Sequence, residues 1–409
     1  MASDPSAPSG PPVTLADVHA ARTLLTGVIR TTPMEFSRGL TDRLGVDVHL
    51  KCENLQRAGS FKIRGAYTRI SRLSEAEKSR GVVAASAGNH AQGVALAASL
   101  LGIRSRVYMP TGAALPKLAA TRGYGAEVEL HGQTLDEALV EAHAYAERTG
   151  AILIHPFDHA DIVAGQGTCG LEILEQVPQV ETIVVSTGGG GLVAGIALAV
   201  KAFRPDIRII GVQAEQAAAY PASLAAGAPV PLAHMQTMAD GIAVGRPGDV
   251  PFGIVDDLVD EVVTVSEGSL SRAVVFLLER AKQVVEPAGA AAVAWLLEHG
   301  EGVPGPIVAV LSGGNIDPLL LLRIIRHGLV AGGRYLEVTV RMPDRPGSLA
   351  RLIADLAAVN ANVIEVDHVR TETGLGVDEV EIAVEVETRG PEHREQVLTA
   401  LAEAGYRLR

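Results

Sequence analysis

The sequence predicts an α/β protein with two lobes of mostly parallel open sheet, followed by a small ferredoxin-like βαββαβ module. Between about residues 46 and 330, short β-branched runs alternate with longer helical patterns, which is typical of strands joined by crossover helices. From residue 335 the order becomes strand, helix, strand, strand, helix and strand, the split βαβ pattern. We therefore expect one domain over residues 13–330, with a smaller lobe over about residues 60–160, and a separate domain over residues 335–409.

The individual elements follow from local patterns. Residues 1–12 are mostly Ser, Pro, Gly and Ala, and we expect a disordered tail there. Thr14, followed three residues later by Asp17, is typical of the N-cap of a first helix. In the body, strands are expected at residues 46–50, 81–85, 106–109, 127–130, 152–155, 182–186, 208–212 and 307–311, and helices between them, for example at residues 91–101, 135–148 and 193–203. In the C-terminal module, strands are expected at residues 335–342, 363–370, 379–387 and 406–409, and helices at residues 348–359 and 392–404.

The composition excludes several classes of protein. Of the 409 residues, 47% are hydrophobic and 20% are charged, and the formal net charge is -12. Nucleic-acid binding depends on Lys and Arg that neutralise phosphates, so this acidic balance argues against a nucleic-acid partner. No apolar run has the length and freedom from charge of a membrane span. With two cysteines and no secretory signal pattern, the sequence predicts a cytoplasmic protein without a membrane partner.

Three glycine-containing turns each follow a predicted strand and precede a predicted helix. The carboxyl ends of parallel strands meet at one edge of a sheet, where ligands bind in open α/β folds. We therefore expect these turns to form a binding site. They are Ser86-Ala87-Gly88-Asn89-His90, Thr187-Gly188-Gly189-Gly190-Gly191 and Ser312-Gly313-Gly314-Asn315.

The four consecutive glycines predict a site for a phosphorylated cofactor. Without side chains, the backbone amides at the start of the next helix are open to a phosphate group. A second interpretation remains open, because Gly189, Gly191 and Ala194 fit the loose dinucleotide pattern, and Glu215 stands where a ribose ligand is expected. In that case the protein would be a nicotinamide-dependent dehydrogenase.

The scarcity of lysine points to Lys62. The chain has six lysines, at positions 51, 62, 78, 117, 201 and 282, and otherwise uses arginine for positive charge. Unlike arginine, a buried lysine can lose its proton and attack a carbonyl to form a Schiff base. Lys62 follows Phe61 at a junction between a loop and a helix. The alternative is a solvent-exposed lysine at the start of a helix.

Taken together, these segments resemble the fold-type II pyridoxal-phosphate enzymes, with the strongest likeness to the threonine ammonia-lyases, also called threonine dehydratases. The likeness covers residues 14–409 and is carried by residues 53–56, 59–66, 86–93, 188–191 and 312–315. It implies that Lys62 forms an imine with pyridoxal 5'-phosphate and acts as the catalytic base. It also implies that Phe61 flanks the cofactor ring, Asn89 binds its 3'-oxygen and Ser312 faces the pyridine nitrogen. The phosphate would lie on Gly188, Gly189, Gly190 and Gly191.

The resemblance further implies β-elimination of L-threonine to 2-oxobutanoate and ammonia. The segment Ser86, Ala87, Gly88, Asn89 and His90 would bind the substrate, although His90 could instead satisfy a backbone group. The neutral hydroxyl of Ser312 disfavours transamination. Serine racemases carry a second serine in place of Ala87, and because alanine has no proton to deliver, elimination is favoured over racemisation. L-serine dehydratase and serine racemase remain alternatives.

The C-terminal module resembles an ACT regulatory domain, with its ligand loop at Asp344-Arg345-Pro346-Gly347-Ser348-Leu349. This implies an amino-acid effector, isoleucine or valine, although the same loop could be a Pro-Gly turn that only starts a helix. A non-enzymatic amino-acid sensor is the alternative from another class. We also expect a homodimer or homotetramer.

The resemblance leaves the metal requirement undetermined. Related enzymes hold a monovalent or divalent cation near residues 208–212 and 286–289. Gln213 stands where some of them use a carboxylate.

Overall fold

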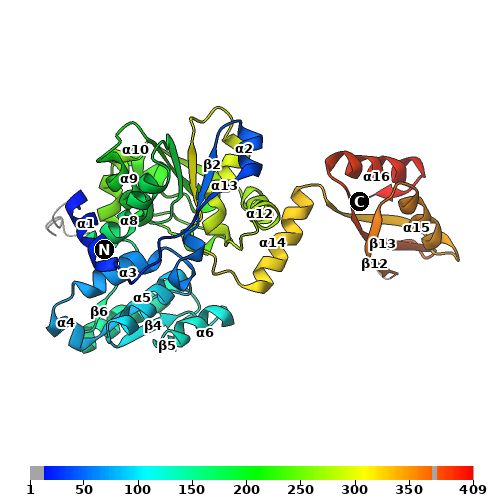
Figure 1. Cartoon of the computed structure of the whole chain (residues 1–409). Coiled ribbons are helices and arrows are strands. Elements are labelled where there is room, and N and C mark those ends of the chain that lie inside the picture. The colour runs from blue at the N-terminus through cyan, green and yellow to red at the C-terminus, as the bar shows by residue number, and fades with distance from the viewer. Residues whose placement is uncertain (1–12, 371–374, 409) are drawn as a thin grey trace. The chain divides into compact units, whose positions relative to one another are not determined.

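The structure is a computed structural model that describes residues 13–370 and 375–408. The chain divides into two compact units, Met1–Leu321 and Leu322–Arg409, and each is described by itself (Figure 1). The predicted disordered tail at residues 1–12 lies outside the described residues. Within the described ranges, no helix is long and apolar enough to cross a membrane.

The larger sheet of the first unit has six strands in the order β1-β2-β10-β7-β8-β9. All neighbours pair in parallel except β1, which runs antiparallel to β2 at the edge. The central strands read as continuous β-branched runs because helices cover a parallel sheet on both faces. The strands are β1 (Met34–Phe36), β2 (Val48–Lys51), β7 (Thr182–Ser186), β8 (Arg208–Ala214), β9 (Glu261–Val265) and β10 (Ile307–Val310).

The smaller sheet has four parallel strands in the order β5-β4-β3-β6. They are β3 (Val82–Ala85), β4 (Ser105–Met109), β5 (Glu127–Leu130) and β6 (Ile152–Leu153). Helix α3 (Lys62–Ser71) packs against α5 (Asn89–Leu100) of the smaller lobe and against α8 (Ala160–Gln176) (Figure 1). The start of α3 therefore lies where the two lobes meet.

The other helices of this unit cover the sheets and connect their strands. Thr14 and Asp17 form the predicted capping box at the start of α1. The helices are α1 (Leu15–Leu25), α2 (Arg38–Leu44), α4 (Glu75–Arg80), α6 (Leu115–Gly123), α7 (Leu135–Thr149), α9 (Gly191–Lys201), α10 (Tyr220–Ala226), α11 (Asp249–Leu258), α12 (Glu267–Phe276) and α13 (Pro287–His299), with α14 (Pro318–Ala331) at the division between the units.

The expected α/β fold is confirmed, with differences at strand ends. All eight strands expected in the body are present, but the one expected at residues 152–155 is only two residues long. The structure adds β1 and β9, which the sequence analysis did not include. β1 has three residues and pairs only at an edge, so its pattern is too short to stand out.

The second unit is a four-stranded antiparallel sheet with two helices, in the order β12-β13-β11-β14. Alternate residues of β11 and β13, such as Val340 and Ile382, are fully buried, as the period of two requires. The elements are β11 (Tyr335–Pro343), α15 (Ser348–Ala358), β12 (Asn362–Val369), β13 (Glu379–Glu387), α16 (Pro391–Glu403) and β14 (Arg407–Leu408). This is the expected βαββαβ module.

Candidate active site

The three glycine turns and the Lys62 segment line one pocket of about 380 Å³ in the first unit. The turns do not share one sheet edge, as the sequence analysis expected: the first follows β3 of the smaller sheet, and the other two follow the neighbouring strands β7 and β10 of the larger sheet. The pocket therefore lies between the carboxyl ends of two sheets. The pocket brings together all the site residues predicted for this unit: Phe61, Lys62, Ser86, Ala87, Gly88, Asn89, His90, Gly188, Gly189, Gly190, Gly191 and Ser312.

Lys62 is the first residue of α3, and its loop is tied to the Ser312 turn. The backbone N–H of Phe61 donates to the carbonyl oxygen of Ser312 at 3.2 Å, and that of Gly314 donates to Gly59 at 2.9 Å. The Lys62 amine donates to the carbonyl oxygen of Pro156 at 3.0 Å. Burial lowers the pKa of Lys62 to about 8, against an opposing effect of Glu286. The amine is thus held in place and is easier to deprotonate than a surface lysine.

Asn89 is oriented by two side chains on opposite sides of its amide. Its Nδ2 donates to Glu286 Oε1 at 2.5 Å, and its Oδ1 accepts from Asn315 Nδ2 at 2.8 Å. Glu286 is buried, and burial raises the pKa of its carboxyl group. A Cβ at Gly313 would overlap Glu286 Oε1. The glycine in the Ser312 turn therefore makes room for this arrangement.

The glycine turn after β7 forms an uncapped helix start. Gly190 has a φ of 97°, and no side chain caps the first amides of α9. A Cβ at Gly189 would overlap the ring of Phe157, and a Cβ at Gly190 would overlap the hydroxyl of Tyr220. The turn therefore presents its backbone directly, as a phosphate site requires.

Ser312 lies in a neutral environment. The hydroxyl of Ser186, at the end of β7, donates to the hydroxyl oxygen of Ser312 at 3.1 Å, and Ser312 is 5% exposed. No carboxylate contacts Ser312 among the hydrogen bonds of the described residues. Two neutral hydroxyls, Ser312 and Ser186, thus line the pocket side by side, and Ser186 was not assigned to the site by the sequence analysis.

His90 and Ser86 differ in what they offer to a ligand. The His90 Nε2–H donates to the carbonyl oxygen of Ile154 at 2.7 Å, and burial lowers the pKa of His90 to about 3. Its Nδ1 is then an acceptor and cannot donate to a carboxylate, so His90 takes the backbone-satisfying role. The Ser86 hydroxyl oxygen accepts from the N–H of Gly88 at 3.1 Å, which leaves its O–H free to donate.

The pocket also contains residues that the sequence analysis did not assign to it. One of them is Lys117, which the sequence shows only as one of the six lysines. Its amine lies 3.5 Å from Asp240 Oδ2. The others carry no motif, because their positions depend on packing between distant segments. These additional lining residues include Lys117, Phe157, Gln166, Asp240 and Glu286.

The structure does not bring two further predicted features to the pocket. Glu215 is exposed and does not line it, although the dinucleotide interpretation needs this carboxylate near the glycine turn. Gln213 is buried, and its Oε1 accepts from the N–H of Tyr220 at 2.9 Å. Within residues 13–370 and 375–408, no cluster of three or more His, Cys, Asp or Glu could hold a metal ion.

The predicted effector loop lies in the second unit, between β11 and α15. Residues 344–347 are exposed, and Gly347 precedes α15 with a φ of 90°. Asp344 Oδ2 accepts from Arg370 Nε at 2.9 Å, and this contact lowers the pKa of Asp344. The loop is thus a surface turn held by this ion pair and by backbone hydrogen bonds, among them that from the N–H of Asp344 to the carbonyl oxygen of Asp378 at 2.8 Å.

A buried amine at a helix start, in one pocket with an uncapped glycine turn, is the arrangement expected of enzymes that bind a phosphorylated aldehyde. The chain belongs to the family described as "Pyridoxal-phosphate dependent enzyme", which it matches over residues 25–313. Residues 336–406 match the ACT domain. The nicotinamide and non-enzymatic alternatives are therefore not supported.

The chain is similar to proteins of known name over most of its length. The L-threonine ammonia-lyase of Thermotoga maritima is 45% identical over 397 residues, which cover 97% of this chain and 99% of the relative. The solved processed form of threonine deaminase isoform 2 from Solanum lycopersicum has a TM-score of 0.73 and 36% identity, over 80% of this chain and 98% of that chain. The solved maize serine racemase has a TM-score of 0.73 and 36% identity, over 76% of this chain and 96% of that chain.

The pocket fits pyridoxal phosphate on three observations. The Lys62 amine has a lowered pKa, the glycine turn leaves a cradle that Cβ atoms would fill, and a hydroxyl pair at Ser186 and Ser312 offers a neutral polar partner. Lys62 would hold the aldehyde carbon, residues 188–191 the phosphate, and Asn89 and Ser312 the polar atoms of the ring.

Proposed function

We propose that the protein is a cytoplasmic threonine ammonia-lyase that converts L-threonine to 2-oxobutanoate and ammonia. The observation that carries the proposal is the position of Lys62, whose amine of lowered pKa faces the glycine cradle in a pocket of about 380 Å³. The likeness to an L-threonine ammonia-lyase over 97% of this chain supports the choice of substrate. The cytoplasmic location is supported by Cys52 and Cys169, which are both free and buried.

Different residues of the pocket have different roles in the elimination. Bound pyridoxal phosphate supplies an aldehyde carbon for an amine and a conjugated ring that accepts the electrons of the α-carbon. The Lys62 Nζ removes the α-proton, for which a neutral amine is needed. Asn89, held between Glu286 and Asn315, would hold the ring by a hydrogen bond to its polar oxygen. Ser312 contributes only a neutral hydroxyl. This favours prompt loss of the substrate's β-hydroxyl over transamination.

The start of α5 is the proposed site for the substrate carboxylate. Helix α5 has twelve residues and no side-chain cap, so its first N–H groups and the positive end of its dipole face the pocket. The free O–H of Ser86 adds a donor beside them. Because His90 is engaged with Ile154 and the N–H of Gly88 with Ser86, the carboxylate would be bound by the Ser86 hydroxyl and the backbone N–H groups of Ala87 and Asn89.

The competing activities are those of an L-serine dehydratase and a serine racemase. One methyl group in a pocket is worth only about 1–3 kcal/mol, so we expect activity on both L-threonine and L-serine. Purified protein assayed for 2-oxo acid and ammonia with L-threonine, L-serine and D-serine should give its highest kcat/KM with L-threonine. A higher kcat/KM for L-serine, or D-serine formation as the main reaction, would overturn the substrate assignment.

The second unit is proposed to regulate this activity by binding isoleucine or valine at residues 344–349. The ACT match over residues 336–406 supports an amino-acid effector. The assembly proposed is a homodimer or homotetramer. Titration with each amino acid, followed by kinetics and by light scattering, should change the KM for L-threonine or the assembly state. If neither amino acid changes either quantity, the regulatory proposal fails. The same assays in Na⁺, K⁺ and Mg²⁺ would test for a cation.

A further inference from the structure

We propose that Arg64 is a positioning residue for Lys62, which fixes the first turn of α3 so that the lysine amine points into the pocket. The inference rests on the proposed role of Lys62, and one of its measurements needs neither cofactor nor substrate. Arg64 does not line the pocket, because its side chain lies on the opposite side of the helix.

Helix geometry separates the two side chains. Lys62 and Arg64 are the first and third residues of α3. At 3.6 residues per turn, positions two apart point about 200° from one another around the helix axis. Lys62 lines the pocket, whereas the side chain of Arg64 is 0% exposed between η1 (Glu53–Leu55) and α8. A rotation or shift of this turn would move both side chains together.

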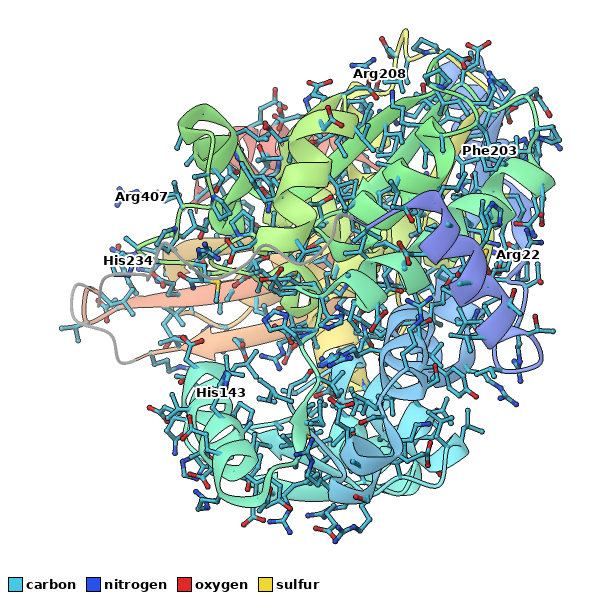
Figure 2. The ribbon with its side chains drawn as sticks, turned by 90° about the vertical axis from the view of Figure 1, so that its left-hand side faces the viewer. Arg22, His143, Phe203, Arg208, His234 and Arg407 are labelled. Carbon is cyan, nitrogen blue, oxygen red and sulfur yellow. The ribbon has the colours of Figure 1, made fainter. Side chains whose placement is uncertain are left out.

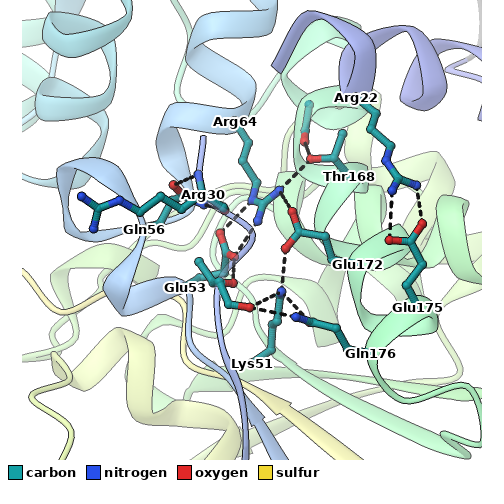
Figure 3. A network of polar contacts seen from close by, with 12 residues as sticks. Arg22, Arg30, Lys51, Glu53, Gln56, Arg64, Thr168, Glu172, Glu175 and Gln176 are labelled. Carbon is teal, nitrogen blue, oxygen red and sulfur yellow. Dashed lines mark hydrogen bonds and ion pairs between the residues drawn. The ribbon is translucent and has the colours of Figure 1, made fainter. Parts of the chain in front are cut away.

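Arg64 is held by four hydrogen bonds in a buried cluster (Figure 3). Its Nε and Nη2 donate to the two carboxylate oxygens of Glu53, each at 2.8 Å. Its Nη1 donates to Glu172 Oε1 at 2.8 Å and to the hydroxyl of Thr168 at 3.0 Å. The planar fork of a guanidinium fixes direction as well as distance in such a two-pronged contact.

Lys51 completes a quartet of charges, defined here as Lys51, Glu53, Arg64 and Glu172. Its amine donates to Glu172 Oε2 at 2.6 Å, to the carbonyl oxygen of Thr32 at 3.0 Å and to Gln176. The exposed fractions of the four side chains are between 0% and 9%. Two cations balance two carboxylates, so removal of one member leaves an uncompensated charge in the interior.

Buried ion pairs are weak evidence for stability, because desolvation offsets much of their attraction. Well-packed apolar side chains of similar volume would serve stability equally well. A role in positioning the first turn of α3 is the better account of the quartet. The quartet connects β2, η1, α3 and α8, and its member Arg64 is two residues from Lys62.

Two neighbouring helices contact the first turn of α3 closely on its other sides. A Cβ at Gly93 of α5 would lie 3.1 Å from Lys62 Cβ, and a Cβ at Gly165 of α8 would lie 2.6 Å from the carbonyl oxygen of Arg64. Glycines thus allow both helix backbones to touch this turn. With these contacts, the fork to Glu53 and Glu172 sets the position from which Lys62 reaches Pro156.

The test uses a charge-balanced variant, Arg64→Met with Glu53→Gln. It removes one charge of each sign and keeps the pair of Lys51 and Glu172. The control is Arg22→Met with Glu175→Gln, which makes the same changes in an exposed pair whose carboxylate also lies on α8 (Figure 3). Arg64→Lys serves as a second variant that keeps every charge and loses the two-pronged contact.

Three quantities are measured for the full chain: the melting temperature, kcat and KM for L-threonine, and the pH midpoint for acylation of Lys62 by acetic anhydride. Acylation is followed by peptide mass spectrometry after removal of any bound cofactor. In the balanced variant and in Arg64→Lys, we expect kcat to fall about tenfold or more with KM changed less than about threefold. The acylation midpoint should rise by about one pH unit, because a displaced amine regains water. The control should match the unaltered protein in all three.

If both Arg64 variants keep the acylation midpoint and kcat of the unaltered protein, the positioning role is wrong. A lower melting temperature with an unchanged midpoint would make Arg64 merely structural, which also overturns the proposal. If the unaltered protein has no activity on L-threonine, the proposed function fails, and the acylation midpoint still decides the role of Arg64.

Discussion

The amine of Lys62 donates a hydrogen bond to the carbonyl oxygen of Pro156, which lies 94 residues further along the chain, at 3.0 Å. The contact joins the first turn of α3 to the segment after β6. Burial at this point lowers the pKa of Lys62 from 10.5 to about 8. At pH 7 roughly one amine in ten is then neutral, compared with about one in three thousand at the ordinary value.

This lowered pKa predicts how cofactor incorporation depends on pH. Only the neutral amine attacks an aldehyde, so the rate of pyridoxal phosphate incorporation into cofactor-free protein should rise about tenfold per pH unit below pH 8 and level off above it. Because the carboxylate of Glu286 raises the pKa of Lys62, Glu286→Gln should move the midpoint to lower pH. Stopped-flow absorbance measures both. The exposed Glu261 provides the control Glu261→Gln, and a Glu286→Gln midpoint at or above that of the control would contradict the prediction.

Gly190 is expected to be essential for cofactor binding for two separable reasons. Its φ of 97° strains any residue with a Cβ, and that Cβ would overlap the Tyr220 hydroxyl beside the glycine cradle. Gly190→Ala should therefore weaken pyridoxal phosphate binding by at least about tenfold, measured by equilibrium dialysis. Gly227 has a φ of 67° with nothing within 4 Å of its Cβ position, so Gly227→Ala introduces the strain alone. Equal losses of affinity in the two variants would show that the cradle is not involved.

The lowered pKa of His90 predicts that the protein loses stability in acid. Burial lowers its pKa from 6.5 to about 3, so between these values the unfolded chain binds a proton that the folded chain does not. Stability therefore falls as the pH drops below 6.5, by about 2 kcal/mol at pH 5 from this group alone. His90→Gln keeps an N–H donor for Ile154 without the titration, and its free energy of unfolding should change less between pH 7 and pH 5.

Urea denaturation at the two pH values measures this difference. The control is His234→Gln, because His234 lies exposed on the surface (Figure 2). His234→Gln should lose as much stability as the unaltered protein. If His90→Gln and His234→Gln lose the same amount, His90 does not stay neutral in the folded state.

The sequence identified the parts of the pocket that depend on local pattern. Turns at the carboxyl ends of parallel strands lie at one edge of their sheet, which accounts for the grouping of residues 188–191 with residues 312–315. Residues 86–90 follow a strand of the other sheet, and they join the site through packing of the two lobes, which the pattern of strands does not encode. The scarcity of lysine left six candidates, and the family resemblance singled out Lys62 among them. The β1 strand was not identified, because three residues carry little pattern. The β9 strand, Glu-Val-Val-Thr-Val, carries an ordinary β-branched pattern and was missed although the sequence shows it.

The remaining parts depend on contacts between distant segments. Glu286 reaches Asn89 across 197 residues, and Glu-Pro-Ala-Gly reads only as the start of a helix. Arg64 and Glu172 look like surface charges in sequence, because each is surrounded by helical pattern, yet they pair in the interior over 108 residues. Burial of a charge is a property of packing and leaves no local signal.

Ala87 offers a test of why this pocket should eliminate rather than racemise. It lines the pocket next to the start of α5, and its methyl group can neither accept nor deliver a proton. A hydroxyl at this position could return a proton to the face opposite Lys62, so Ala87→Ser should raise the rate of D-serine formation from L-serine at least about tenfold. Chiral chromatography of the products measures this gain. Ala85→Ser places the same hydroxyl two residues earlier in the same pocket lining, at the end of β3, and should produce no such gain. If both variants form D-serine equally, the added hydroxyl acts without positional selectivity, and the absence of a second serine is not what directs the reaction toward elimination.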